Sequence, residues 1–303
     1  MSNRLGIEWY DESCAEFIIT TAEQLYDIAR LSDFYTFENQ TIKLGADIQV
    51  NEGEARDWKL APPEKKWIPI SGFAGTFDGQ GHSISGIYGK SAFTKIAMFT
   101  NTRSTCQIQN IRLLNSYFEN HGHEGTASFV AGGSGTWKRL YSDAILYCNG
   151  ELCGGIASKL ATDAKILDCW FAGTILQTGR RMGGIVAEVT GGNICVEHIV
   201  FSGDICTEDS IASQNDGVYV GGIFGWVGKD CTISVSDSLI FGSVRAPKNP
   251  KYCASSIGRV FDGAKVTINH VCDTVPDDAL SIVGRGTVEG QITKVIRKER
   301  MSV

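Results

Sequence analysis

Apolar residues along this chain alternate with polar or small residues in short runs that are rich in isoleucine, valine and phenylalanine. The segments "ILDCWFAGTI" and "VEHIVFSGDI" show this pattern. A period of two is typical of β-strands that bury one face. Glycines separate the runs, and glycine is favoured where a chain turns sharply. The pattern therefore predicts many short strands joined by corners.

The pattern repeats along the chain at intervals of roughly 30 to 40 residues. The repeats begin with "GGIASKL" at Gly154, "GGIVAEV" at Gly183, "GGIFGWV" at Gly221 and a degenerate "SSIGRVF" at Ser255, and a weaker copy, "AGGSGTW", begins at Ala131. A repeat of this length suits a solenoid in which each repeat forms one coil. Successive coils stack about 4.8 Å apart, so equivalent side chains form ladders along the axis.

One segment departs from the strand pattern. The run "TTAEQLYDIARL", residues 20 to 31, has the spacing of an amphipathic helix. Its apolar stripe consists of Leu25, Ile28, Ala29 and Leu31. Thr20 with Glu23, and Thr21 with Gln24, have the spacing of a capping box. Because the first coil of a solenoid has an open strand edge and an open core, we predict that this helix is a lid.

Together these elements predict an all-β fold, a single-stranded right-handed parallel β-helix (β-solenoid) with an N-terminal capping helix. We assign residues 1–60 to a cap with one helix and entering strands. Residues 61–290 form the coils, and residues 291–303, which include "KVIRKER", form a basic C-terminal tail.

Composition narrows the classes of function. The net charge of −6 gives no electrostatic basis for a nucleic-acid partner. No apolar run approaches the roughly 20 residues of a membrane span, so we predict no membrane insertion. The ten cysteines show no CxxC spacing and fall mainly in apolar runs, which favours buried thiols over metal ligands or disulfides. We predict no metal site and no cofactor.

The stretch "FAGTFDGQGHSISGI", residues 73 to 87, contains several glycines, an aspartate and a histidine. It lacks the spacing of a dinucleotide-binding loop or a P-loop, and no helix pattern follows it to bind a phosphate. We therefore interpret it as one more coil, with "GTFDG" as a corner. Asp78 and His82 are then predicted to be corner and strand-edge residues.

The longer string "WIPISGFAGTFDGQGHSISGIYG", residues 67 to 89, resembles the signature of GLUG-motif proteins. The resemblance extends over most of residues 8 to 245. It implies a β-helical region of the kind found in large bacterial surface proteins, including some IgA-cleaving metallopeptidases. The peptidase activity of those proteins belongs to a zinc domain with an HExxH motif, which this sequence lacks.

The resemblance implies an extracellular or cell-surface location. The first residues, "MSNRLGIEWYDESC", contain no apolar signal core. A cytoplasmic or phage-borne protein, or a mature fragment, therefore stays open as an alternative.

Variable segments occur at one position in each coil, before the next "GGI". They comprise 119–125, 176–182, 207–219 and 245–253. Because coils stack, we expect these segments to project from one side and to carry any binding site. The candidate ligand-binding residues are Arg180, Arg181, Tyr219, Glu208, Asp209, Asp216, His121, His123 and Tyr252. Arg180, Arg181 and Tyr219 are the preferred ones, and as loop-tip residues they are expected to contribute little to stability.

Other candidate chemistry is weaker. Glu208, Asp209 and Asp216 offer an acid pair for glycosidic cleavage, and His121 and His123 offer at most two ligands for a metal. Two further side-chain ladders are expected. One is a polar corner series, Asp168, His198, Asp237 and Asn269, and the other is an aromatic series for sugar stacking, Trp137, Trp170 and Trp226.

The sequence therefore favours a non-enzymatic binding or adhesion module that recognises a glycan or a surface protein through loops stacked on one side. Two alternatives stay open. One is a carbohydrate-active β-helix enzyme, either a polysaccharide lyase or a glycosidase. The other is a structural component of a phage or injection-system tail.

Overall fold

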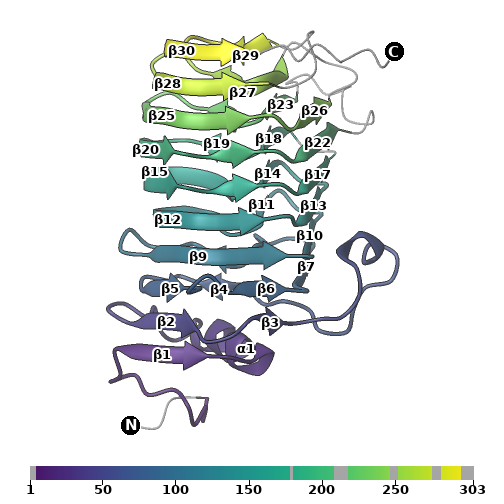
Figure 1. The fold of residues 1–303 in the computed structure, drawn as a ribbon, viewed down its shortest axis with the longest axis vertical. Coiled ribbons are helices and arrows are strands. Elements are labelled where there is room, and N and C mark those ends of the chain that lie inside the picture. Colours follow the sequence, from purple (N-terminus) through teal and green to yellow (C-terminus); the bar gives the residue numbers. More distant parts are fainter. Residues whose placement is uncertain (1–4, 178–179, 208–217, 246–251, 275–280, 295–303) are drawn as a thin grey trace, which may run out of the picture.

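Each coil contributes short parallel strands that pair with the equivalent strands of the coils before and after it, as the computed structural model shows (Figure 1). The structure describes residues 5–177, 180–207, 218–245, 252–274 and 281–294. The predicted fold class, an all-β parallel β-helix with an N-terminal helix, is confirmed. The stack of paired strands begins at β1 (Glu16–Ile19), which pairs with β2 (Thr41–Leu44). The division into domains stays a prediction.

The strands form three main sheets. Sheet A contains β1, β2, β3 (Ile48–Gln49), β5 (Thr76–Asp78), β6 (Ser83–Ser85), β9 (Gln107–Leu114), β12 (Gly133–Ser142), β15 (Ala157–Leu167), β16 (Trp170–Phe171), β19 (Val186–Val189), β20 (Gly192–Glu197), β21 (Val200–Phe201), β24 (Phe224–Val227), β25 (Cys231–Ile240), β27 (Ala254–Val260), β28 (Lys265–Asp273), β29 (Ser281–Arg285) and β30 (Glu289–Lys294). Sheet B contains β7 (Tyr88–Ser91), β10 (Tyr117–Asn120), β13 (Ile145–Cys148), β17 (Thr174–Gln177), β22 (Asp204–Thr207) and β26 (Ser243–Arg245). Sheet C contains β11 (Thr126–Ala127), β14 (Leu152–Gly154), β18 (Arg181–Gly183) and β23 (Tyr219–Gly221), and a separate pair is formed by β4 (Ile70–Ser71) and β8 (Phe99–Thr100).

A ladder of apolar side chains runs through the core behind sheet A. The pairing register aligns Phe17, Ile42, Phe77, Ile108, Trp137, Ile166, Val196, Val235 and Ile268, and all of them are buried. Burying one such side chain stabilises the fold by about 1.5–3 kcal/mol. Trp137 belongs to this ladder, so the expected exposed series with Trp170 and Trp226 does not form.

The repeated Gly-Gly pair has two separate steric causes. A Cβ on the first glycine of the second repeat, Gly183, would lie 1.8 Å from the carbonyl oxygen of Val186, because the chain bends sharply there. A Cβ on the second glycine, Gly184, would lie 2.3 Å from the carbonyl oxygen of Gly222 in the next coil and 2.4 Å from the ring of Phe201 in the core. Both glycines are therefore required, the first by the bend and the second by the stacking of the coils and by core packing.

The degenerate repeat replaces both glycines with serine. There Asp273 occupies the ladder position that Phe201 and Ile240 hold in the preceding coils. Asp273 is fully buried, and Ser255 and Ser256 donate hydrogen bonds to its carboxylate, the latter over 2.7 Å. A smaller polar side chain thus leaves room for the serine side chains, and their hydroxyls stabilise the buried carboxylate.

A column of corner residues has positive φ angles. It consists of Asn110, Arg139, Asp168, His198, Asp237 and His270, with φ between 50° and 59°. Nδ1 of His198 lies 3.3 Å from Oδ1 of Asp168, and Nδ1 of His270 lies 3.2 Å from Oδ1 of Asp237. The predicted corner series is therefore correct for three positions and wrong at Asn269. The register pairs Asn269 with Ser236 in the strands and leaves His270 in the corner.

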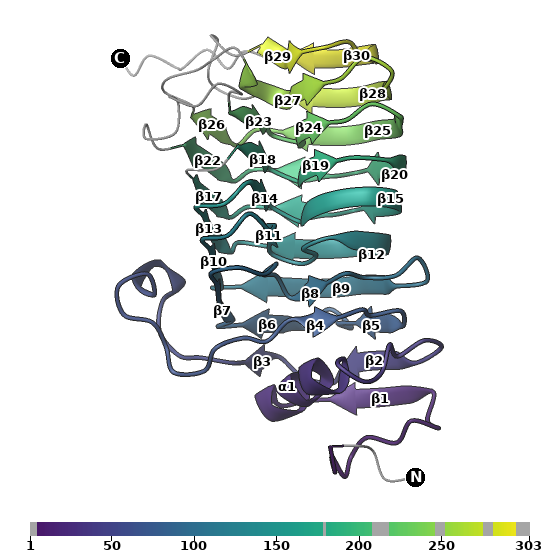
Figure 2. The same cartoon turned by 180° about the vertical axis from the view of Figure 1, so that it is seen from behind.

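Helix α1 (Ala22–Leu31) has Thr21 as its N-cap, one of the two predicted caps. The Thr21 hydroxyl accepts a hydrogen bond from the Gln24 amide over 3.2 Å, and the Gln24 side chain accepts one from the Thr20 amide over 2.8 Å. The predicted apolar stripe, Leu25, Ile28, Ala29 and Leu31, is fully buried in the core. The helix lies at the N-terminal end of the solenoid, next to β4 (Figure 2).

The glycine-rich stretch at residues 73–87 forms two strands with a corner between them. The strand predicted after the corner is present as β6, but the prediction of "GTFDG" as the corner is wrong, because Thr76–Asp78 forms β5 and buries Phe77 in the core. The corner lies at residues 79–82, where Gln80 and Gly81 have φ angles of 54° and 87°. Asp78 accepts hydrogen bonds from the Gln80 amide and from the side chains of Gln109 and Asn110, at 2.8–2.9 Å. His82 instead lies 3.4 Å from Asp47. The two residues therefore do not form a pair.

The cysteines are all free thiols. Six are buried, three are half-buried and Cys14 is exposed. The interpretation of most cysteines as small core residues is therefore confirmed.

A candidate ligand-binding corner

The predicted variable segments connect sheet B to the strands that follow it in each coil. Segment 119–125 connects β10 to β11, and segment 176–182 connects β17 to β18. Because the strands of sheets B and C stack in register, the described ends of these segments form one column. Figure 2 shows the two columns of strands side by side. Glu208, Asp209 and Asp216 lie outside the described residues.

The column has an additional member that the sequence analysis missed. Residues 92–96 follow β7, which pairs with β10 in sheet B. Residues 92–96 connect β7 to β8, and no Gly-Gly pair precedes β8. The missing Gly-Gly signal explains why this segment was not recognised as part of the loop side.

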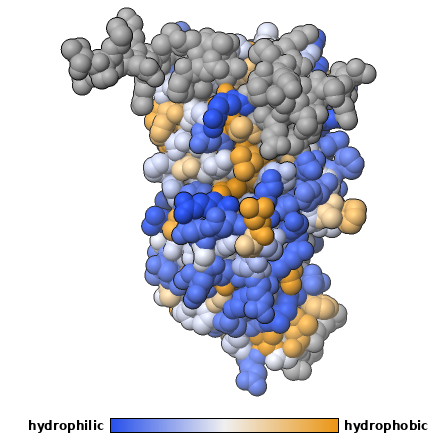
Figure 3. Space-filling model, turned by 90° about the vertical axis from the view of Figure 1, so that its right-hand side faces the viewer, coloured by the Kyte–Doolittle hydropathy of each residue, from blue (hydrophilic) through white to orange (hydrophobic). Residues whose placement is uncertain are grey.

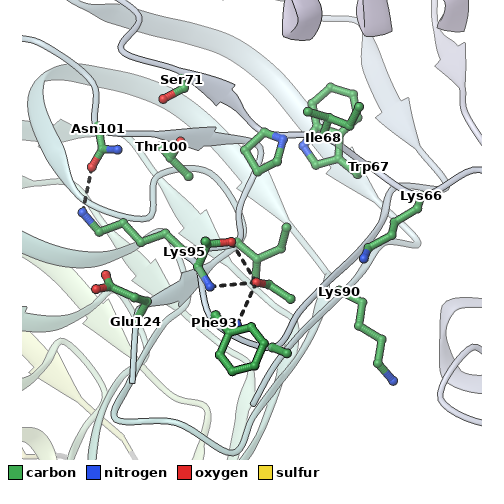
Figure 4. A pocket seen from close by; sticks show the side chains of 15 residues that line it. Lys66, Trp67, Ile68, Ser71, Lys90, Phe93, Lys95, Thr100, Asn101 and Glu124 are labelled. Atoms are coloured by element: carbon green, nitrogen blue, oxygen red, sulfur yellow. Dashed lines mark hydrogen bonds between the residues drawn. The ribbon is translucent and has the colours of Figure 1, made fainter. Parts of the chain in front are cut away.

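A cavity of about 940 Å3 lies at residues 92–96, the additional segment of this column. Its walls come from three parts of the chain (Figure 4). The first is residues 66–69 with Ser71, at the start of β4, and the second is residues 90–96, at the end of β7 and after it. The third comprises Thr100, Asn101 and Glu124. The volume of the cavity is at the upper end of the range for small-ligand sites. The cavity therefore combines segments of three successive coils.

Phe93 projects at the centre of the cavity wall and is 85% exposed. Ser91 holds the turn that carries it. The Ser91 hydroxyl accepts hydrogen bonds from the amides of Phe93 and Thr94, at 3.3 and 2.9 Å. An exposed phenylalanine on an ordered turn loses little conformational freedom when it binds a ligand.

Three lysines line the same cavity. Figure 4 shows Lys66 and Lys90 on one side of Phe93 and Lys95 on the other. Lys95 donates a hydrogen bond of 2.7 Å to the side chain of Asn101. Among the described lining residues, Glu124 is the only carboxylate, so the cavity is cationic although the chain carries a net charge of −6.

Asn120 fixes two adjacent segments of the corner to each other. Its side-chain amide is fully buried and donates to the carbonyl oxygens of Thr94 and Glu124, at 3.0 and 3.1 Å. Its side-chain oxygen accepts a hydrogen bond from Gly122 over 2.7 Å. One asparagine thus positions both the turn after Phe93 and the segment that carries Glu124.

A buried carboxylate lies beside the cavity. Glu119 is 3% exposed and lies 3.0 Å from the ammonium of Lys90, and its carboxylate also contacts Nε2 of His121. Burial acts to raise the pKa of Glu119, but the hydrogen bonds and charges of His121 and Lys90 outweigh it, so the pKa lies below its ordinary value. The pKa of Lys90 is raised, chiefly by its hydrogen bond to Glu119.

The lowered pKa of Glu119 predicts a pH dependence of stability. A carboxyl whose pKa is lower in the folded state stabilises the fold above its unfolded pKa, and this contribution is lost as the pH falls through the folded pKa. We expect Glu119→Gln to lower the free energy of unfolding by about 2 kcal/mol at pH 6. The difference from the unmodified protein should shrink below pH about 4. Urea denaturation at several pH values measures it, and a difference that stays constant with pH contradicts the assignment.

The two histidines of segment 119–125 have different partners. His121 contacts Glu119 and its ring packs against Tyr147, whereas Nδ1 of His123 lies 3.6 Å from Glu151 in the next coil. Within the described ranges, no three His, Cys, Asp or Glu side chains lie close enough together to hold a metal ion.

Arg181 and Tyr219 do not lie at loop tips, which corrects the prediction. Arg181 is in β18, where Nη1 donates a hydrogen bond of 2.9 Å to the buried carboxylate of Glu188. Tyr219 is in β23 and is 6% exposed, and its hydroxyl accepts a hydrogen bond of 2.8 Å from Arg259. With these contacts, we now expect both side chains to contribute to stability. Their role in ligand binding stays a prediction.

These side chains form a ladder on the outer surface between sheet C and the adjacent strands of sheet A. The rings of Tyr219 and Tyr252 lie 5.0 Å apart, and the guanidinium of Arg181 lies 4.9 Å from the Trp226 ring. Arg180 and Tyr252 are half-buried and lie just before β18 and β27. The sequence therefore identified a cluster of neighbours, whose members lie in strands or next to the start of a strand.

A long excursion covers the outer face of sheet B next to the cavity. Residues 52–65 leave the coil between β3 and β4 and include the 3-10 helix η1 (Ala55–Asp57). Trp58 packs against Tyr88, which stacks on Tyr117 with ring centroids 6.0 Å apart. On the face that carries sheet B, hydrophobic patches alternate with hydrophilic surface (Figure 3). The excursion ends at Lys65, where the cavity begins.

No family model and no curated protein matches the sequence. Among solved structures, the fold is similar to the crystal structure of a "putative immunoglobulin A1 protease from Bacteroides ovatus", with a TM-score of 0.62. The two chains are 16% identical, and the alignment covers 92% of this chain and 84% of that chain. At this identity the similarity shows a shared β-solenoid fold and no shared activity. Among the described residues, no helix is long and apolar enough to cross a membrane.

Proposed function

We propose that this β-solenoid is a GLUG-type binding or adhesion module that recognises an acidic glycan in the cavity around Phe93. The observation that carries the proposal is the exposed Phe93 ring in a cavity that Lys66, Lys90 and Lys95 also line. The apolar face of a sugar ring packs on an aromatic side chain. Lysine ammonium groups pair with the carboxylates of uronic or sialic acids.

Binding is favoured over glycosidic cleavage because of the carboxylates at the site. Glycosidases place two carboxyl groups on opposite sides of the scissile bond. Among the described residues that line the cavity, Glu124 is the only carboxylate, and the buried Glu119 is engaged by Lys90 and His121. Peptidase activity is not proposed, because the sequence has no HExxH motif.

A surface location agrees with this function, since acidic glycans are abundant outside cells. The GLUG-like string and the similarity in fold to a bacterial chain support a bacterial surface protein. We include this location in the proposal.

We expect Phe93→Ala to weaken binding of acidic oligosaccharides by at least about tenfold, because the main contact surface for the sugar is removed. We expect Lys95→Gln to weaken it by about two- to fivefold, and increasing salt to have the same effect, because exposed charges are screened. Isothermal titration with acidic and neutral oligosaccharides measures both.

Phe34→Ala is the matched control, because Phe34 is also exposed, at 49%, and does not line the cavity. This variant should bind normally. Equal binding of neutral and acidic sugars, or an unchanged affinity of Phe93→Ala, would contradict the proposal.

A further inference from the structure

A second cavity lies beside α1, adjacent to the cavity around Phe93. It has a volume of about 330 Å3 and shares Lys66 and Ile68 with the first. It is otherwise lined by Glu23, Tyr26, Arg30 and Lys65. The two volumes lie at opposite ends of the range for single small ligands.

The helix and the excursion place the residues of the second cavity. Glu23, Tyr26 and Arg30 are spaced by three and four positions, so they lie on one face of α1. The side chain of Asn51 fixes the end of the excursion, because it donates to the Lys65 carbonyl over 2.9 Å and accepts from the Lys65 amide over 3.2 Å. The positions of Lys65 and its neighbour Lys66 are therefore set by the fold.

Apolar side chains connect the walls of the two cavities. Trp67 lines the first cavity, Tyr26 lines the second, and their ring centroids lie 5.3 Å apart, although Trp67 is only 2% exposed. Ile68, which is 48% exposed, lines both cavities. Its side chain offers an exposed apolar surface that can contact a sugar ring between the two cavities.

Positive charge also extends along the whole site. The cationic residues are Arg30, Lys65, Lys66, Lys90 and Lys95, and the acidic lining residues are Glu23 and Glu124. Lys65 lies 3.6 Å from Glu23, and Arg30 pairs with Asp27 on the helix. Both cationic side chains are more than half exposed, so these pairs are weak and both can turn toward a ligand.

We infer that the site takes a linear acidic polysaccharide, with a carboxylate on successive units, that runs from the Phe93 cavity across Lys66 and Ile68 to the face of α1. This inference rests on the proposed function and specifies its ligand class. A repeating carboxylate matches cations distributed along a groove, whereas a single acidic sugar fills only one cavity.

The test compares oligogalacturonates of three and eight units. A trimer occupies the Phe93 cavity, and an octamer reaches both cavities. We expect the octamer to bind the unmodified protein at least about tenfold more tightly than the trimer, because the second contact becomes intramolecular. An octamer also gains affinity from its larger number of equivalent binding positions, so the variants decide the result.

The double variant Arg30→Gln/Lys65→Gln should lower the affinity for the octamer by about fivefold or more and leave the affinity for the trimer unchanged. The control is Lys43→Gln/Lys138→Gln, which removes the same charge from sheet A, outside both cavities. It should bind both oligomers like the unmodified protein. Circular dichroism verifies that all variants are folded.

The outcomes separate the inference from the proposed function. If the trimer binds and the double variant binds the octamer normally, the second cavity is not part of the site, and the proposed function stands. If neither oligomer binds, the proposed function fails together with the inference. If oligothymidylate binds with the same sensitivity to the double variant, the site recognises a phosphodiester chain, and the carbohydrate assignment is overturned.

Discussion

Alanine at position 181 is expected to lower the free energy of unfolding by about 3 kcal/mol, because it leaves a buried carboxylate without its main hydrogen-bond donor. The side chain of Glu188 is 4% exposed, and Oε1 accepts a hydrogen bond of 2.9 Å from Arg181. Lys159 stays 3.7 Å from Oε2 and compensates in part. Urea denaturation of the unmodified protein and of Arg181→Ala measures the difference.

The double variant Arg181→Met/Glu188→Gln provides the control. Neutralising both partners removes the buried charge together with its counter-ion, so this variant should be more stable than Arg181→Ala. Arg181→Lys should be intermediate, because lysine keeps the charge but lacks the planar donor group. If Arg181→Ala unfolds at the same urea concentration as the unmodified protein, the ion pair does not contribute to stability. The original prediction that Arg181 contributes little to stability would then be correct.

Replacement of the first glycine of a repeat should have an effect of similar size. In Gly183→Ala the new Cβ would lie 1.8 Å from the carbonyl oxygen of Val186. That oxygen belongs to the backbone and cannot rotate away, so the bend has to open and disturb the stacked strands. We expect a loss of about 3 kcal/mol, at the upper end of the cost of overpacking. Thermal denaturation and the yield of soluble protein measure the effect.

Gly81→Ala separates this steric effect from backbone strain. Gly81 has a φ of 87°, and a Cβ there meets no atom within 4 Å. The only expected loss of stability in this variant comes from placing alanine in the left-handed backbone conformation, about 1–2 kcal/mol. Gly183→Ala should be clearly less stable than Gly81→Ala. If Gly81→Ala is instead the less stable of the two variants, the bend does not require a glycine at position 183.

Much of the fold could be predicted because the coils of a solenoid repeat one local sequence pattern. The Gly-Gly pair at Gly154, Gly183 and Gly221 appears in the sequence at each bend, and the strands between the pairs show the period of two. The helix was also predictable, because its stripe and its cap are local features. The error at Asn269 is a shift of one residue: the pairing of Ile268 with Val235 and of Asn269 with Ser236 places His270 in the corner.

The candidate site was less predictable. The sequence pointed to the side of the solenoid on which the candidate cavity lies, through segment 119–125, which contributes Glu124. It did not indicate Phe93 or the lysines, because their coil has no Gly-Gly pair to mark its place in the repeat. It also suggested that Arg181 and Tyr219 were exposed tips, because loops and strand ends cannot be separated by composition alone.

The sequence by itself therefore determined the repeating fold, the core ladders and the side on which variable segments gather, because each of these depends on local patterns with a fixed period. Only the tertiary structure decided which residues form the cavity. Lys66, Lys90 and Glu124 are far apart along the chain and become neighbours when three coils stack. The structure also decided that Arg181 and Glu188 form a buried pair, because whether a charge is buried depends on the coils above and below it.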